Sequence, residues 1–112
     1  MQWEHYCAEN QVVDIKTIST EKPVLIFKHS TRCPVSSMAK RELFSPSEDF
    51  PDNAHYVFID IINCRALSKA VEAEFNVVHE SPQVLVIVDE KCVYQASHQD
   101  ISSRKLLPEL IN

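Results

Sequence analysis

The chain has 112 residues, of which 45% are hydrophobic and 24% charged, and these proportions fit one ordinary globular domain over residues 1–112. The net charge is −5 and there is no basic run, so we expect no nucleic-acid partner. No stretch reaches the roughly 20 apolar residues that span a bilayer, and the first residues do not resemble a signal peptide. We therefore expect a cytoplasmic protein with no membrane partner.

Hydrophobic periodicity divides the chain into alternating helices and strands. Apolar residues three or four positions apart predict amphipathic helices, and short runs of apolar, β-branched residues predict strands that are covered on both faces. In chain order we expect a helix over 10–18, a strand over 23–28, a helix over 34–44, a loop over 49–53, a strand over 56–62, a helix over 64–75, strands over 84–88 and 92–96, and a helix over 101–110. Because the chain has no glycine, we expect positive φ angles on Asn or Asp.

This order of elements predicts an α/β fold with three layers. A helix joins the first two strands, so these should be parallel with a right-handed connection, and the last two strands should form a hairpin. The result is a four-stranded mixed sheet between helices (β-α-β-α-β-β-α) with an extra N-terminal helix, which is the order of the thioredoxin-like fold. Asn63 is the expected N-cap of the helix over 64–75, and Asp100 or Ser102 caps the last helix.

The chain has four cysteines, and their spacing excludes some roles. They are Cys7, Cys33, Cys64 and Cys92. No two form the close pair that is typical of structural zinc, so we expect no metal site. In a reducing cytosol we expect no disulfide framework either. Each cysteine is by default a small buried hydrophobe, so a functional one must be identified from its neighbours.

Cys33 has neighbours that indicate chemistry. It follows the first predicted strand and precedes Pro34, which suits the first helical position because its missing N–H costs nothing there. Cys33 would then cap the helix, where free N–H groups and the positive helix end favour the thiolate that attacks disulfides. Arg32 and Lys28 would add positive potential. The alternative is a structural cysteine at a helix start.

Ser36 stands where a dithiol enzyme carries its second cysteine. The sequence C-P-V-S therefore cannot close a disulfide within the motif, and a mixed disulfide on Cys33 must wait for an outside thiol or a distant cysteine. We expect the Ser36 hydroxyl either to donate a hydrogen bond to the Cys33 sulfur or to serve as an ordinary helix-capping group.

Ser81-Pro82 directly precedes the third predicted strand, at the sheet edge where Cys33 is expected. A cis peptide bond here would turn the backbone of Ser81 toward the reacting sulfur. Its N–H and C=O could then pair with a substrate as a short added strand. The alternative is a trans proline that merely starts a strand.

Together these motifs resemble one family. The stretch from His29 to Ser36 (HSTRCPVS) is similar to the active-site stretch of the bacilliredoxin C family, which are monothiol, thioredoxin-like proteins of the bacillithiol system. The stretch 79–83 (HESPQ) resembles the cis-proline segment of that family. Phe27-Lys28, Asp60 and Ser97-His98 also fit. The resemblance covers nearly the whole chain.

The resemblance implies a thiol–disulfide oxidoreductase with no bound cofactor and with bacillithiol, a low-molecular-weight thiol, as cosubstrate. Cys33, with Ser36 beside it, would take bacillithiol from client proteins, and a second bacillithiol or a reductase would reset it. The residues implied to contact the substrate are Arg32, Pro34, Ser81 and Pro82. The implied partners are S-bacillithiolated client proteins, bacillithiol and its disulfide, and a disulfide reductase.

Two positions depart from the family pattern. Arg32 stands where many relatives are expected to have a smaller polar residue. Cys64 follows the second predicted strand at the same sheet edge as Cys33 and also starts a helix, so it is a candidate resolving cysteine if the two Cα atoms lie within about 7 Å. The alternative for Cys64 is a packing role. We expect Cys92 to be inert at the far end of the sheet, and Cys7 is not placed.

Other polar side chains are expected near this edge. Three histidines lie by strand ends that face it and could tune the thiolate, although they also suit ordinary loop positions. They are His29, His79 and His98. The basic residues that could meet the carboxylates of bacillithiol are Lys28, Arg32 and Arg65.

Three competing functions remain. A peroxiredoxin-type peroxidase would share the spacing Ser30-Thr31-Arg32-Cys33, but Ile26 stands where that motif carries a proline. An arsenate-type reductase would need an arginine cluster after the cysteine, and none is evident. A thioredoxin-fold adaptor or redox-sensing module would keep the fold without turnover, and an unreactive Cys33 would favour it.

Overall fold

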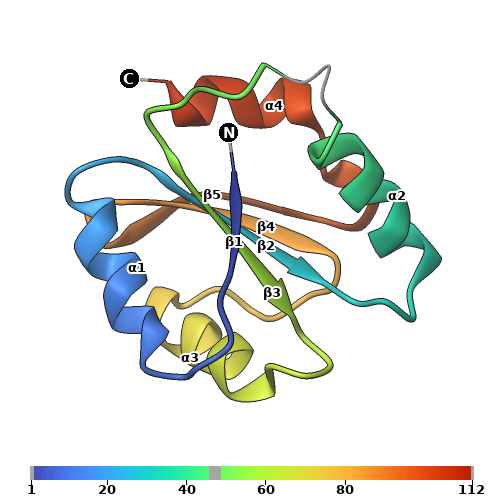
Figure 1. Cartoon of the computed structure of the whole chain (residues 1–112), viewed down its shortest axis with the longest axis horizontal. Coiled ribbons are helices and arrows are strands. Elements are labelled where there is room, and N and C mark those ends of the chain that lie inside the picture. Colours follow the sequence, from blue (N-terminus) through green and yellow to red (C-terminus); the bar gives the residue numbers. More distant parts are fainter. Residues whose placement is uncertain (1, 46–48, 112) are drawn as a thin grey trace.

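The computed structural model describes residues 2–45 and 49–111. Its strands form one five-stranded sheet in the order β1-β3-β2-β4-β5, and helices cover both faces (Figure 1). The elements are β1 (Trp3–His5), α1 (Gln11–Ser19), β2 (Val24–His29), α2 (Pro34–Leu43), β3 (His55–Asp60), α3 (Arg65–Phe75), β4 (Gln83–Val88), β5 (Lys91–Ser97), the 3-10 helix η1 (His98–Asp100) and α4 (Ser103–Leu110). No helix within the described ranges has the length and apolar character needed to cross a membrane.

The prediction of four strands is wrong, because β1 adds a fifth at the edge of the sheet. This strand pairs in parallel with β3, from Trp3 opposite Tyr56 to His5 opposite Phe58. Three residues are too few to show an alternating pattern, so the strand is defined by its partner and not by its own sequence. The other predicted helices and strands are present, with ends shifted by one or two residues.

The strand β2 lies in the middle of the sheet and is buried along its whole length. It pairs in parallel with β3 and antiparallel with β4, where Lys28 lies opposite Gln83. The carboxyl ends of β2 and β3 therefore lie next to the start of β4. We call this side of the sheet, which is formed by strand ends and not by an outer strand, the carboxyl edge. The loops that follow β2 and β3 and the loop that precedes β4 all gather there.

Side chains alternate between two cores, one on each face of the sheet. On one face α2 and α4 cover an aromatic group centred on Phe27, whose ring centroid lies 5.8 Å from that of Phe58 (Figure 1). Trp3 stacks on Phe44 just after α2, at 5.0 Å. On the other face α1 and α3 cover aliphatic residues, with Ile26 at the centre of the sheet.

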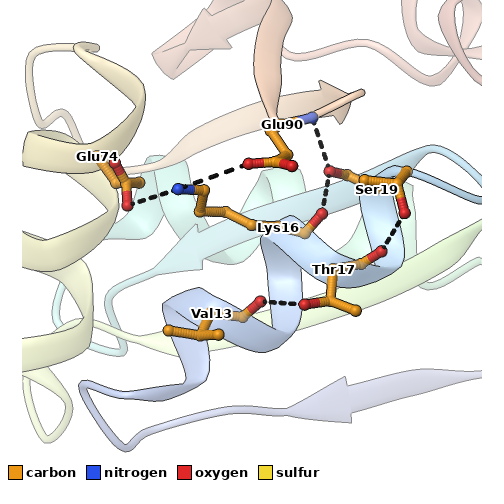
Figure 2. A network of polar contacts seen from close by, with 7 residues as sticks. Val13, Lys16, Thr17, Ser19, Glu74 and Glu90 are labelled. Atoms are coloured by element: carbon orange, nitrogen blue, oxygen red, sulfur yellow. Dashed lines mark hydrogen bonds and ion pairs between the residues drawn. The ribbon is translucent and has the colours of Figure 1, made fainter.

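A surface network ties α1 to α3 and to the turn between β4 and β5 (Figure 2). The Lys16 ammonium lies 3.1 Å from a carboxylate oxygen of Glu74 and 3.6 Å from one of Glu90. The Ser19 hydroxyl accepts a hydrogen bond from the Glu90 N–H at 2.9 Å and donates one to the Lys16 carbonyl at 2.7 Å. Because the ion pairs are partly exposed, they contribute little to the free energy of unfolding. The Ser19 hydrogen bonds join the end of α1 to the turn between β4 and β5.

Without glycine, the chain places positive φ on other residues. Asn76 ends α3 with φ 56°, and Asp89 has φ 54°, as predicted for Asn and Asp. Glu90 and His98 also have positive φ, which was not predicted. In both residues the backbone N–H donates a hydrogen bond: that of Glu90 to the Ser19 hydroxyl, and that of His98 to the Pro82 carbonyl at 3.0 Å.

Cys7 and Cys64 form a disulfide with Cα atoms 4.8 Å apart, so the expectation of no disulfide is wrong. The reason is topological: Cys7 follows β1, Cys64 follows β3, and these neighbouring parallel strands end side by side. Cys64 also occupies the N-cap of α3, the position predicted for Asn63. At the last helix Ser102 is the N-cap, one of the two predicted residues.

The disulfide should stabilise the fold by restricting the unfolded chain, because it joins residues 57 positions apart. The loss of entropy in the unfolded chain would by itself raise the free energy of unfolding by about 4 kcal/mol, which is an upper value. We expect Cys7→Ser to lower the free energy of unfolding by about 2–4 kcal/mol in urea titrations without reductant. With excess dithiothreitol, wild type and variant should unfold alike. Equal midpoints without reductant would contradict the prediction, and Cys92→Ser serves as the control.

Candidate functional site

Cys33 occupies the N-cap of α2, with extended backbone angles (φ −113°, ψ 117°) and Pro34 at the first helical position, as predicted. Its N–H donates to the Ser30 carbonyl at 3.3 Å, and its carbonyl accepts from the Ser37 N–H at 3.1 Å. The thiol is free and half-buried. Its sulfur makes no capping hydrogen bond with the described first turn, so the backbone places this residue and leaves the side chain available.

Ser36 is fully buried and does not play the predicted part of a partner for Cys33. Its Oγ lies 2.6 Å from His29 Nδ1 and accepts the Ser30 N–H at 3.0 Å. Burial, aided by the Lys40 charge, lowers the pKa of His29, which leaves the imidazole neutral at neutral pH. Ser36 Oγ and His29 Nδ1 therefore share one hydrogen bond, whichever of the two atoms carries the proton. Ser36 thus anchors the loop that carries Cys33 to the end of β2.

The Ser81–Pro82 peptide bond is cis, as the resemblance implies, and Pro82 is buried at the start of β4. The Pro82 carbonyl accepts the N–H of His98. His98 in turn lines a cavity of about 280 Å³ together with Val35 and the exposed Met38 of α2. The cis-proline segment and the first turns of α2 therefore adjoin at the carboxyl edge. The Ser81 Oγ is buried and has no hydrogen-bond partner within the described residues.

A second cavity, of about 320 Å³, opens at the carboxyl edge on the face covered by α3. The loop after β3 forms one wall, and its Ile61 N–H donates to the His29 carbonyl at 3.0 Å, which joins it to the end of β2. The lining residues are Ile61, Ile62, Arg65, Ser68, Lys69, Glu72 and His79. The cavity combines two cations with one carboxylate. Sequence reasoning missed it because its walls come from three separate segments.

Lys28 is fully buried, so the prediction that it meets a ligand carboxylate is wrong, whereas its contribution of positive potential stays a prediction. Its Nζ donates to the Ser68 carbonyl at 3.2 Å and lies 3.2 Å from His79 Nδ1. Burial lowers the pKa of Lys28 to about 8, although the charge of Glu72 opposes this. Arg32 and Arg65 are exposed and remain available to a ligand.

The three histidines near this edge have different partners and do not form one group. His29 binds Ser36 on the α2 face, and His79 binds Lys28 on the α3 face. His98 is exposed, with Nε2 at 3.4 Å from a carboxylate oxygen of Glu80. Of the three, His29 is the one bonded to the Cys33 motif, and it does so through Ser36.

The remaining cysteines are either bonded in a disulfide or have a thiol whose pKa is raised by burial. Cys64 is already bonded to Cys7, so its sulfur is not free to attack Cys33 in this structure. Its resolving role stays a prediction, and it requires that the disulfide be reduced first. Cys92 is half-buried in β5, and burial raises the pKa of its thiol, in agreement with an inert side chain.

Several solved structures share this architecture. One protein described by its thioredoxin fold is 26% identical, with a TM-score of 0.77 over 93% of this chain and 89% of that one. Thioredoxin from Schistosoma mansoni, 13% identical, has a TM-score of 0.76 over 99% of this chain and 100% of that one. Malassezia sympodialis thioredoxin, 14% identical, has a TM-score of 0.74 over 97% and 88%. At such identities the two thioredoxins show the fold alone.

The family comparison covers the site as well as the fold. The family model described as monothiol bacilliredoxin BrxC matches residues 6–106. That span includes Cys33, the cis-proline segment and both cavities. This protein therefore has a thioredoxin-like fold and belongs to the monothiol bacilliredoxin family.

Proposed function

We propose that the chain is a monothiol thiol–disulfide oxidoreductase that removes bacillithiol from client proteins through Cys33. The observation that carries the proposal is a free thiol at the N-cap of α2, at the same edge of the sheet as a cis-proline segment, with serine in place of a second cysteine. Family membership supports the redox chemistry and suggests bacillithiol as the cosubstrate.

The first step transfers bacillithiol to the protein. The Cys33 thiolate attacks the bacillithiol sulfur of the mixed disulfide on a client. A new S–S bond joins Cys33 to bacillithiol while the client–bacillithiol bond breaks. The client sulfur leaves as a thiolate and takes a proton from solvent, so one disulfide is exchanged for another without net oxidation.

The second step needs an outside thiol. The Ser36 hydroxyl cannot form a disulfide and is hydrogen-bonded to His29, while Cys64 is bonded to Cys7. A second bacillithiol thiolate therefore attacks the bacillithiol sulfur on Cys33, and this yields bacillithiol disulfide and the Cys33 thiolate. A disulfide reductase then reduces bacillithiol disulfide to two thiols.

Substrate contacts divide between two parts of the carboxyl edge. Ser81 and Pro82 precede β4, where an extended client segment can pair with the Ser81 backbone as an added strand. Arg32 and Pro34 are exposed on either side of Cys33. Arg65, in the larger cavity, offers a guanidinium to a carboxylate of bacillithiol.

The test of the proposal is the covalent intermediate. We expect wild type with the Cys7–Cys64 disulfide intact, incubated with bacillithiol disulfide, to gain one bacillithiol, seen as a single adduct by intact mass, because Cys33 is a free thiol and burial raises the pKa of the other free thiol, Cys92. Cys33→Ala should gain none, and Cys92→Ser should behave as wild type. An adduct that persists in Cys33→Ala would contradict the assignment. In protein whose Cys7–Cys64 disulfide has first been reduced, retention of the adduct in Cys64→Ala but not in wild type would instead support resolution by Cys64.

The role of Arg65 can be measured with two small disulfides of different charge. We expect Arg65→Glu to slow the reaction of Cys33 with the dianionic 5,5′-dithiobis(2-nitrobenzoate) roughly fivefold, since an exposed charge contact contributes about 1 kcal/mol. The rate with neutral 4,4′-dithiodipyridine should not change. Arg104→Glu, on exposed α4 surface, is the matched control. Equal slowing with both reagents would show that Arg65 acts on the fold or thiol and not on ligand charge.

A further inference from the structure

A buried amine supports the loop before the cis-proline, although the proposed chemistry does not use it. Lys28 is 0% exposed and is the penultimate residue of β2. Its Nζ contacts the Ser68 carbonyl and His79 Nδ1, each at 3.2 Å. The Ser68 hydroxyl oxygen lies 3.3 Å from His79 Nδ1. The contacts join β2, α3 and the loop that leads to Pro82.

His79 is held at its backbone as well as its ring. Its N–H donates to Glu72 Oε2 at 2.7 Å. Further along the loop, the Gln83 side chain donates to the Val78 carbonyl at 3.1 Å and accepts the Glu80 N–H at 3.3 Å. The segment from Val78 to Gln83 is thus fastened to α3 and to β4, and the contact with Lys28 fastens it to β2.

Burial of an amine is costly, so its presence needs a reason. An apolar side chain of similar length would fill the same space without the loss of hydration. Lys28 also lies opposite Gln83, directly beside the cis-proline segment. Cys33 lies five residues beyond Lys28 in the chain, in the loop that follows β2, so the end of β2 leads to the nucleophile and also pairs with the start of β4.

We propose that Lys28 is a positioning residue, whose amine holds His79 and thereby keeps the backbone of Ser81–Pro82 in place to receive an extended client beside Cys33. This inference rests on the proposed function and extends it to regulation by pH. The Lys28–His79 contact needs an unprotonated Nδ1, because a protonated imidazole would turn an N–H toward the amine.

The charges around His79 set the direction of the pH effect. Burial and then the Lys28 charge lower the pKa of His79, while Glu72 on α3 and Glu80 on the loop oppose this. Arg65 and Lys69 of α3 line the adjoining cavity. The lowered pKa keeps the ring neutral at neutral pH, and the contact is lost only as pH falls through this lowered pKa, which lies below the ordinary histidine value of about 6.5.

The experiment compares two reactions of Cys33 that differ in their need for the Ser81–Pro82 backbone. One probe is an extended peptide joined through its cysteine to 2-nitro-5-thiobenzoate, and the other is 4,4′-dithiodipyridine, which has no peptide backbone. We compare the second-order rate constant with the peptide probe, divided by that with 4,4′-dithiodipyridine. A change in the reactivity of the Cys33 thiol alters both rate constants and cancels in this ratio. We expect Lys28→Met to lower this ratio at least tenfold, with Lys91→Met, an exposed lysine, as the matched control.

The pH profile separates positioning from a general fold defect. In wild type the ratio should fall in acid as His79 protonates, with a midpoint below the ordinary histidine pKa of about 6.5. His79→Asn keeps an acceptor near the Nδ1 position but does not titrate, so it should hold the ratio within about twofold of wild type at pH 7.5 and abolish the acidic fall. Equal loss with both probes in Lys28→Met, an unchanged ratio, or a persistent acidic fall in His79→Asn would each overturn the proposal.

Failure of the proposed function would look different. If wild-type Cys33 reacted with neither probe, the oxidoreductase assignment itself would fall. If wild type reacted with both and Lys28→Met matched it, the assignment would stand and the role of Lys28 would be rejected.

Discussion

The site depends on the way β2 ends. This strand is buried on both faces, yet its last two residues are polar. Because neighbouring side chains in a strand point to opposite faces, Lys28 and His29 enter different layers. Lys28 meets His79 on the α3 face, and His29 meets Ser36 on the α2 face. Adjacent residues of one strand thus anchor the two segments on which the proposed chemistry relies.

This arrangement explains the part played by serine in the C-P-V-S motif. A buried hydroxyl must find partners, and Ser36 finds them in the His29 ring and the Ser30 backbone. These contacts fix the loop without using the Cys33 sulfur. The thiol is therefore positioned by the backbone and left half-exposed to disulfides, while the residue that would resolve it in a dithiol protein serves the scaffold instead.

The carboxyl edge holds both a disulfide and a free thiol. Parallel strands β1, β3 and β2 end together, and a cysteine follows each of them. Cys7 after β1 and Cys64 after β3 are paired, whereas Cys33 after β2 is free. The pairing secures a very short edge strand and the start of α3, next to the cavity that contains Arg65. The free thiol is left beside the cis-proline segment as the centre of exchange.

The sequence by itself determined the central strands, the helices between them, the place of Cys33 before Pro34, and the family. These features are local: a run of apolar residues, a helical period or a motif of eight residues shows them directly.

The sequence did not reveal β1, because three residues become a strand only through pairing with β3. Nor did it reveal the Cys7–Cys64 bond, the partners of Ser36, or the burial of Lys28. Each of these joins segments distant in the chain, and a residue's own neighbours in sequence cannot show which distant group will lie beside it. Tertiary structure alone decided these contacts, because chain topology and side-chain alternation set which groups meet at the carboxyl edge.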